Sequence, residues 1–253
     1  MRDARENQEG SKERFAKRII AAIAAVAMLG GVGYATATTA VAEEEAGTLA
    51  TESFMGTTVG SEWTLLNDAC LTAGGDLGCE AKGKANGDRG IYGQSNGLLQ
   101  LTGDENSTTG GAVFNHQLDT SLGLDVTFYQ YQTKGSKADG IGFFLADGNQ
   151  NLTTTGASGA GLGYANTRGD GNPHDGLSEG VLGLGLDVYG NFANDRHWVG
   201  GSDCTKYLSD QTPNSVVLRG AGNGSTGYCK VTDAVTYNGL TTTTAPLVGN
   251  SYK

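Results

Sequence analysis

Apolar and polar residues alternate with a period of two in several short stretches of this chain. The alternation is clearest over residues 124–132, and it returns over 138–148 and 182–188. A period of two places successive side chains on opposite faces of an extended strand. The pattern therefore predicts a β-strand in each stretch. In the first of them, the residues expected to face a core are Leu124, Val126 and Phe128.

Shorter stretches of the same kind occur along the rest of the chain, separated by glycine-rich segments. They cover residues 62–66, 97–102, 111–116 and 214–220. In the glycine-rich segment 156–165, we expect the apolar part to form a strand and residues 159–161 to form a turn. No helical period is sustained after the first 45 residues. Short strands joined by glycine turns are typical of an antiparallel sandwich, so the expected fold class is all-β.

The N-terminal residues follow a different pattern. A basic segment precedes an apolar run of eleven residues, from Ile19 to Leu29, and small residues follow it. This order is typical of a secretory signal peptide, and the run is short for a membrane span. We therefore expect a signal peptide at 1–42 and one domain at 43–253, in a secreted or cell-surface protein without a membrane span. An uncleaved anchor is the alternative.

Composition and charge narrow the range of partners. The chain has 42 glycines, 3 prolines and a formal net charge of −10. Without residues 1–42, 11 basic and 23 acidic residues remain. A chain this acidic, without a basic stripe, is a poor ligand for nucleic acid or anionic membrane. Its carboxylates are compatible with divalent cations.

Four cysteines are present, an even number that suggests disulfides in an exported protein. The expected pairs are local ones, Cys70 with Cys79 and Cys204 with Cys229. Four unpaired buried thiols are the alternative. No spacing of cysteine and histidine indicates a zinc site.

Several motifs occur in the order in which they occur in the L-type, or legume-like, lectins. The chain resembles this family of the concanavalin A-like superfamily, and above all its secreted bacterial members, over roughly residues 54–228. Segments 70–74 and 213–220 also look like that bacterial subgroup. The motifs are Ala138-Asp139-Gly140 with Phe143-Phe144, the glycine turn before Leu162-Gly163, and Asp187-x-Tyr189-x-Asn191.

The resemblance implies a jelly-roll sandwich with a shallow sugar site. Asp139 matches the family's sugar-binding aspartate, which follows a cis peptide bond after Ala138. A carboxylate at this position accepts hydrogen bonds from vicinal hydroxyls, and the alternative is a solvated aspartate at a strand start. Gly161 lies in the turn whose backbone N–H reaches the sugar, although Ala160 stands where the family often has a second glycine. Aromatic candidates for stacking on the sugar are Phe114, His116, Tyr164 and Trp198.

The resemblance also implies a calcium ion. Its ligands would be the Asp187 carboxylate, the Tyr189 carbonyl, Asn191 and Asp195, and Asn191 would bind the sugar as well. An Asp/Asn/Gly turn without an ion is the alternative. The family's second, transition metal needs a glutamate where this chain has Gly185, so we expect no transition metal, although His197 lies near the family's histidine.

The function expected from these residues is that of a calcium-supported, non-catalytic lectin that binds glycans or glycoconjugates. A glycoside hydrolase is one alternative, but no strand carries alternating carboxylates for that chemistry. An adhesive surface module with a decayed sugar site is another. Family domains continue with several strands beyond residue 220, so we expect either that C-terminal strands are missing or that the ending diverges.

Overall fold

The computed structural model of the chain describes residues 50–84, 97–121, 123–132, 138–169, 171–205, 209–235 and 251–252. The chain divides into two compact units, Met1–Glu45 and Ala46–Lys253, and the described residues belong to the second. The expected signal peptide at 1–42 therefore lies outside them. Within the described part, no helix is long and apolar enough to cross a membrane.

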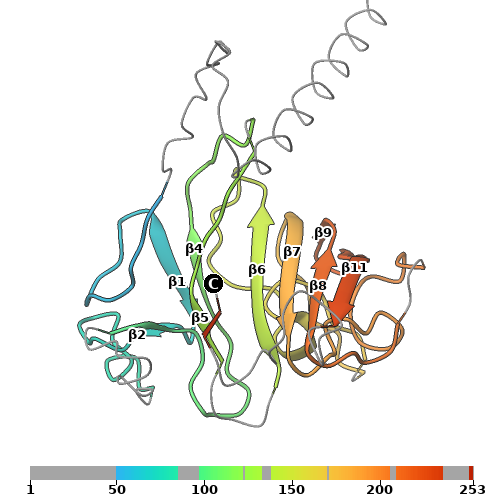
Figure 1. The fold of residues 1–253 in the computed structure, drawn as a ribbon, viewed down its shortest axis with the longest axis horizontal. Coiled ribbons are helices and arrows are strands. Elements are labelled where there is room, and N and C mark those ends of the chain that lie inside the picture. Colours follow the sequence, from blue (N-terminus) through green and yellow to red (C-terminus); the bar gives the residue numbers. More distant parts are fainter. Residues whose placement is uncertain are drawn as a thin grey trace, which may run out of the picture. The chain divides into compact units, whose positions relative to one another are not determined.

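Strands account for nearly all the regular structure in the described residues, which makes this part of the chain all-β (Figure 1). The largest sheet has six antiparallel strands with β7 at its centre, between β6 and β8. Phe143 on β6 lies opposite Leu184 on β7, which in turn lies opposite Leu218 on β8. The strands of this sheet are β6 (Gly140–Ala146), β7 (Gly180–Asp187), β8 (Ser215–Arg219), β9 (Gly222–Asn223), β10 (Thr226–Gly227) and β11 (Lys230–Val235).

Three smaller sheets, each of two antiparallel strands, complete the strand set of the described residues. A short 3-10 helix, η2 (Gly159–Gly161), lies in the connection from β6 to β7. The pairs are β1 (Trp63–Asn67) with β4 (Gly110–Phe114), β2 (Cys70–Leu71) with β3 (Leu99–Gln100), and β5 (Gln130–Tyr131) with β12 (Ser251–Tyr252).

Glycines on β7 let the connecting loops pack directly on one face of the large sheet. A Cβ atom at Gly183 would lie 2.2 Å from Cδ1 of Tyr164, and one at Gly185 would lie 2.3 Å from Cδ1 of Phe192. Both aromatic residues are fully buried. Side chains of the loops thus take the space that strand side chains would otherwise fill. The core formed in this way comprises Leu66, Val113, Leu152, Ala160, Tyr164, Ala165, Leu177, Phe192, Ala193, Val199, Val217 and Tyr228.

The strand expected over residues 124–132 is largely wrong. Gln130–Tyr131 forms β5, but residues 123–129 pair with no strand among those described. Val126 is 46% exposed and Phe128 is 37% exposed, so these two side chains do not face a core, and Phe128 stacks on Phe143 with ring centroids 6.1 Å apart. Alternation shows that a strand could have two different faces, but a strand also needs a hydrogen-bonded neighbour.

Other expectations along the chain have mixed outcomes. The strands expected near residues 62–66, 97–102, 111–116, 138–148, 182–188 and 214–220 are present as β1, β3, β4, β6, β7 and β8. The strand expected within 156–165 is absent, because the glycines there form η2 and turns. Beyond residue 220, where we expected missing C-terminal strands or a divergent ending, the structure has the strands β9, β10 and β11.

Both expected disulfides are present. Cys70 is bonded to Cys79, and Cys204 is bonded to Cys229. The structure thereby confirms local pairing and excludes four unpaired thiols. Disulfides persist in oxidising compartments, which is the setting that an exported chain enters.

Candidate functional site

Pairing of β6 with β7 brings two of the sequence motifs together. Gly140 lies opposite Asp187, and the backbone N–H groups of Val188 and Tyr189 both donate to the Asp139 carbonyl, each at 3.0 Å. The Ala138–Asp139 peptide bond is cis, as the resemblance implied. Glycine is required at position 140, since a Cβ atom there would lie 2.3 Å from the Leu186 carbonyl oxygen. Asp139 is therefore fixed beside the loop that follows β7.

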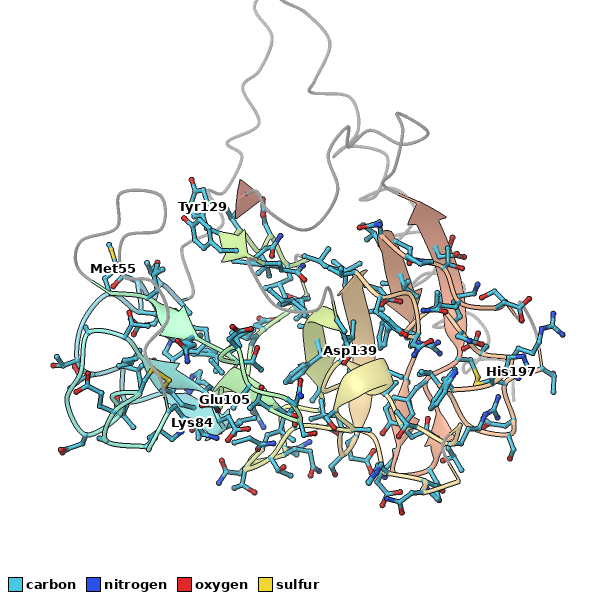
Figure 2. All side chains as sticks on the ribbon, turned by 90° about the horizontal axis from the view of Figure 1, so that it is seen from below. Met55, Lys84, Glu105, Tyr129, Asp139 and His197 are labelled. Atoms are coloured by element: carbon cyan, nitrogen blue, oxygen red, sulfur yellow. A yellow bond between two sulfur atoms is a disulfide. The ribbon has the colours of Figure 1, made fainter. Side chains whose placement is uncertain are left out.

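The carboxylate of Asp139 is half-buried and forms no hydrogen bond with any residue that the structure describes. Burial raises the pKa of Asp139 above its ordinary value. Figure 2 shows the residue next to the 3-10 helix η2, and a Cβ atom on Gly159 would lie 3.7 Å from Oδ2 of Asp139. The third motif thus joins the first two, with an unpaired acceptor where they meet.

Gly161, the residue expected to present a backbone donor, is buried in this turn. Its N–H donates to the Ser158 carbonyl at 3.2 Å. Gly159 is exposed, and its N–H donates to no other backbone group among the described residues. The available donor next to Asp139 therefore belongs to Gly159, two residues before the expected one. Gly159 has a φ of 58°, in the region that favours glycine, but because residues 159 and 161 are both glycines the sequence carried no signal that separates them.

Asp187 organises the loop that begins at the end of β7. The side chain is 1% exposed, and its Oδ1 accepts from Gly190 N–H at 2.7 Å while its Oδ2 accepts from Ala193 N–H at 3.0 Å. Burial raises the pKa of Asp187 to about 7, and the N–H groups of Gly190, Ala193 and Phe192 oppose that rise. Both carboxylate oxygens are thus engaged by the backbone of their own loop.

Of the next two expected calcium ligands, Tyr189 accepts a hydrogen bond at its carbonyl, and Asn191 forms no side-chain hydrogen bond with another described residue. The Tyr189 carbonyl accepts a hydrogen bond from Nε2 of Gln211 at 2.8 Å. Asn191 is half-buried, and its side chain forms no hydrogen bond with another described residue. Asn191 is therefore the ligand in this set whose amide remains available to a bound molecule.

Asp195, the fourth expected calcium ligand, is completely buried against Arg219, with Oδ1 2.6 Å from Nη1 of the arginine. A calcium ion needs six to eight oxygen ligands at about 2.3–2.6 Å. Here the oxygens of Asp187 and Tyr189 already accept from N–H donors. Oδ1 of Asp195 is ion-paired with a guanidinium cation, while neither Asp195 oxygen accepts a hydrogen bond of good geometry from a described residue. With a guanidinium cation beside Asp195, the residues in this arrangement do not fit a calcium ion.

The expected aromatic candidates differ in burial and in contacts. Tyr164 is fully buried and its hydroxyl donates to the Gly220 carbonyl at 2.9 Å, and Trp198 packs against the core. Phe114 and His116 contact each other at the end of β4, with ring centroids 5.7 Å apart. Tyr189 is the aromatic residue whose backbone bonds to Asp139, and it is 43% exposed. Sequence reasoning named Tyr189 for its carbonyl and missed its ring.

The neighbours of Gly185 and His197, the two positions considered for a second metal, are defined in the structure. Gly185 is buried under the Phe192 ring, which leaves no room for a longer side chain. His197 is exposed, with Nε2 3.6 Å from a carboxylate oxygen of Asp210. This histidine therefore has a surface carboxylate as its neighbour.

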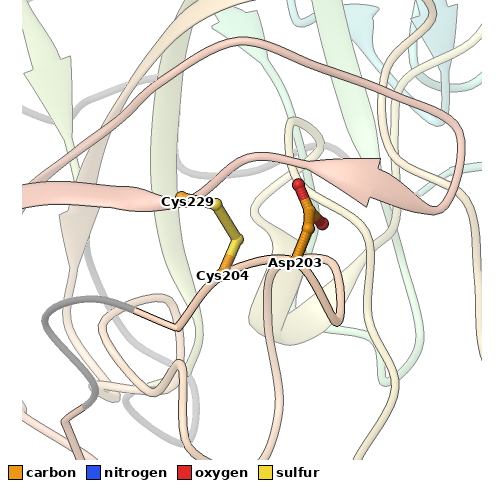
Figure 3. Close-up of side chains that lie close together, drawn as sticks. All are labelled: Asp203, Cys204 and Cys229. Atoms are coloured by element: carbon orange, nitrogen blue, oxygen red, sulfur yellow. A yellow bond between two sulfur atoms is a disulfide. The ribbon is translucent and has the colours of Figure 1, made fainter.

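A separate group of potential metal ligands comprises Asp203, Cys204 and Cys229, whose ligand atoms lie within 4.8 Å of one another. Figure 3 shows that the two sulfur atoms are joined in a disulfide. Asp203 Oδ1 accepts from the Gly227 N–H at 3.2 Å. Because thiolates are the sulfur ligands of metals, this group supports no metal site.

Comparison with known sequences adds no family assignment. A scan against protein-family models finds no match, and a search of curated proteins finds no similar sequence.

Proposed function

We propose that this protein binds carbohydrate through the site around Asp139 and does not catalyse a reaction. The observation that carries the proposal is the half-buried Asp139 carboxylate without a hydrogen-bond partner among the described residues. A partly desolvated acceptor is costly unless a donor reaches it. Sugar hydroxyls are donors of suitable size, and a carboxylate has two oxygens to accept from two of them.

Neighbouring groups complement such a ligand. The exposed Gly159 N–H supplies a donor beside Asp139, and the amide of Asn191 supplies both a donor and an acceptor. The exposed ring of Tyr189 offers an apolar face against which a pyranose can pack. Affinity for one monosaccharide would be weak, with a Kd of about 1 mM, and useful avidity would come from multivalent glycans.

The burial of Asp187 favours binding over hydrolysis. Glycoside hydrolysis needs two carboxyl groups, about 5–10 Å apart, on either side of the bond that breaks. Asp187 is the carboxylate on which the charge of Asp139 acts, but it is 1% exposed and both of its oxygens accept backbone N–H groups. It is therefore placed to hold the loop and not to meet a substrate.

We also propose a fold and a cellular location for this protein. We take the strands to be those of a jelly-roll sandwich of the concanavalin A-like kind, in a bacterial protein exported through the signal peptide at 1–42. The two disulfides support an oxidising compartment. An adhesive module with a decayed sugar site is the competing function, and Ala160 in the turn is the observation that favours it.

A glycan array probed with the full chain tests the proposal. Each array is run with calcium chloride and again with a chelator, and the bound glycans are then assayed for hydrolysis. We expect binding to some glycans without release of reducing sugar. Absence of binding in both conditions would favour the decayed module, and turnover that Asp139→Asn abolishes would establish a hydrolase instead.

The matched control is a second aspartate at the other end of β6. Asp147 is exposed and accepts from the Asn149 N–H within its own turn. Asp139→Asn should weaken glycan binding about tenfold or more, because one acceptor becomes a donor. Asp147→Asn should leave binding unchanged, and equal losses in both variants would contradict a role for Asp139 in the site.

A further inference from the structure

The loop after β7 packs against a buried cation from another strand. Arg219, the last residue of β8, is fully buried, and its guanidinium lies 4.9 Å from the centroid of the Phe192 ring. A buried guanidinium keeps its charge and needs acceptors for its five donors. The hydrogen-bond acceptors of Arg219 show which segments its side chain links.

Its contacts converge on the loop that carries the candidate site. Nε donates to the Phe192 carbonyl at 2.9 Å, and Nη2 donates to the same oxygen. Nη1 lies 2.6 Å from Oδ1 of Asp195 and donates to the Tyr228 carbonyl at 2.6 Å. One side chain therefore joins two positions of the loop to the segment that leads into β11.

These acceptors overlap with the oxygens that a calcium ion would require. Asp195 is one of the four expected ligands, and its negative charge is balanced by the guanidinium of Arg219. Asp187 is satisfied by backbone N–H groups, and the Tyr189 carbonyl by Gln211. A guanidinium in this position would also repel a second cation brought next to it.

We propose that Arg219 takes the place of a divalent cation in this protein, so that the 187–195 loop keeps its shape without calcium. Arginine suits the role because its planar fork reaches several acceptors at once, whereas a lysine ammonium is a single point charge. The inference concerns the loop that the proposed function uses, but it does not require sugar binding. Its tests therefore contain no sugar, and their failure is distinct from failure of the glycan array.

The first test measures thermal unfolding of the full chain in millimolar calcium chloride and in millimolar EGTA, together with calorimetric titration of calcium chloride into the chain. We expect the same melting temperature in both solutions and no saturable heat of binding. A melting temperature that rises with calcium and falls with EGTA would overturn the proposal. This arm needs no substitution, so it decides the question even if variants fail to fold.

The second test compares variants of two arginines. Arg219→Lys should lower the melting temperature by roughly 10 °C, because an ammonium group cannot keep both the buried ion pair with Asp195 and the hydrogen bonds to the Phe192 carbonyl. Arg196→Gln is the matched control, since Arg196 lies at the surface and pairs with Asp210 at 3.0 Å. Exposed pairs contribute little, so the control should melt like the parent chain. An Arg219→Lys chain that also melts like the parent would overturn the role of the guanidinium.

Discussion

Substituting Gly185 by alanine tests the packing that supports the candidate site. A Cβ atom at this position of β7 would lie 2.3 Å from Cδ1 of Phe192 and 3.2 Å from Cδ1 of Leu162. Carbon atoms in contact are ordinarily about 3.5–4.0 Å apart. The Phe192 ring would have to move by about 1 Å or more. It is fully buried and its carbonyl is bound to Arg219, so the movement would disturb the loop.

The size of the effect follows from two opposing contributions. Overpacking a dense core costs about 1–3 kcal/mol. Replacing glycine by alanine gains about 0.4–1 kcal/mol by reducing the conformational entropy of the unfolded chain. We therefore expect Gly185→Ala to lower the free energy of unfolding by about 1.5 kcal/mol. For a unit of this size, that corresponds to a melting temperature about 3–6 °C lower.

Urea denaturation followed by tryptophan fluorescence measures this difference. The control is Gly220→Ala, where a Cβ atom would meet nothing nearer than Cγ2 of Val231 at 3.7 Å. It should be as stable as the parent chain or slightly more stable. A second comparison places Gly185→Ala in a Phe192→Leu background, where the smaller side chain should reduce the cost by about 1 kcal/mol.

The reasoning is refuted if Gly185→Ala unfolds at the same urea concentration as the parent chain. It is also refuted if the substitution costs the same with leucine at 192 as with phenylalanine. Either result would mean that the ring does not press on β7 at this position.

Three further predictions concern stability. Tyr164→Phe removes the hydroxyl that donates to the Gly220 carbonyl at 2.9 Å, which should cost about 1–2 kcal/mol in urea denaturation. Joint replacement of Cys204 and Cys229 by alanine opens a loop with a sequence separation of 25, and should cost about 3.5 kcal/mol of unfolding free energy; equal stability would contradict it. Burial raises the pKa of Asp187 from 3.8 to about 7, so the folded state prefers the protonated acid. The stabilisation from protonated Asp187 is complete below the unfolded-state pKa of 3.8 and is lost as the pH rises through the folded-state pKa of about 7. Urea titrations at about pH 5 and pH 8 should therefore give a lower free energy of unfolding at pH 8.

Local patterns in the sequence were enough to predict several elements. Strands β6, β7 and β8 follow from alternating residues that all have a paired neighbour in the sheet. The disulfides follow from cysteines that are near each other in the chain. These features depend on short-range periodicity or on short separation, and such information is present in the sequence itself.

Features that depend on distant partners were predicted less well. Residues 123–129 alternate as clearly as β6 does, yet no described strand pairs with them. In the 3-10 turn the N–H of Gly161 donates to the Ser158 carbonyl, whereas Gly159 lies next to the Asp139 carboxylate. A shift of two residues within a glycine-rich loop leaves no trace in its composition.

The sequence by itself determined that the described part of this chain is all-β, that its cysteines pair locally, and that Asp139 and Asp187 stand at strand ends. Only the tertiary structure decided which groups remain available and which are engaged. The pairing of β6 with β7 leaves the Asp139 carboxylate without a partner among the residues that the structure describes, while Arg219 reaches across 24 positions to Asp195 and both charges are buried. The physical reason is that a strand pattern specifies a face, whereas a hydrogen-bond partner is specified by the packing of segments far apart in the chain.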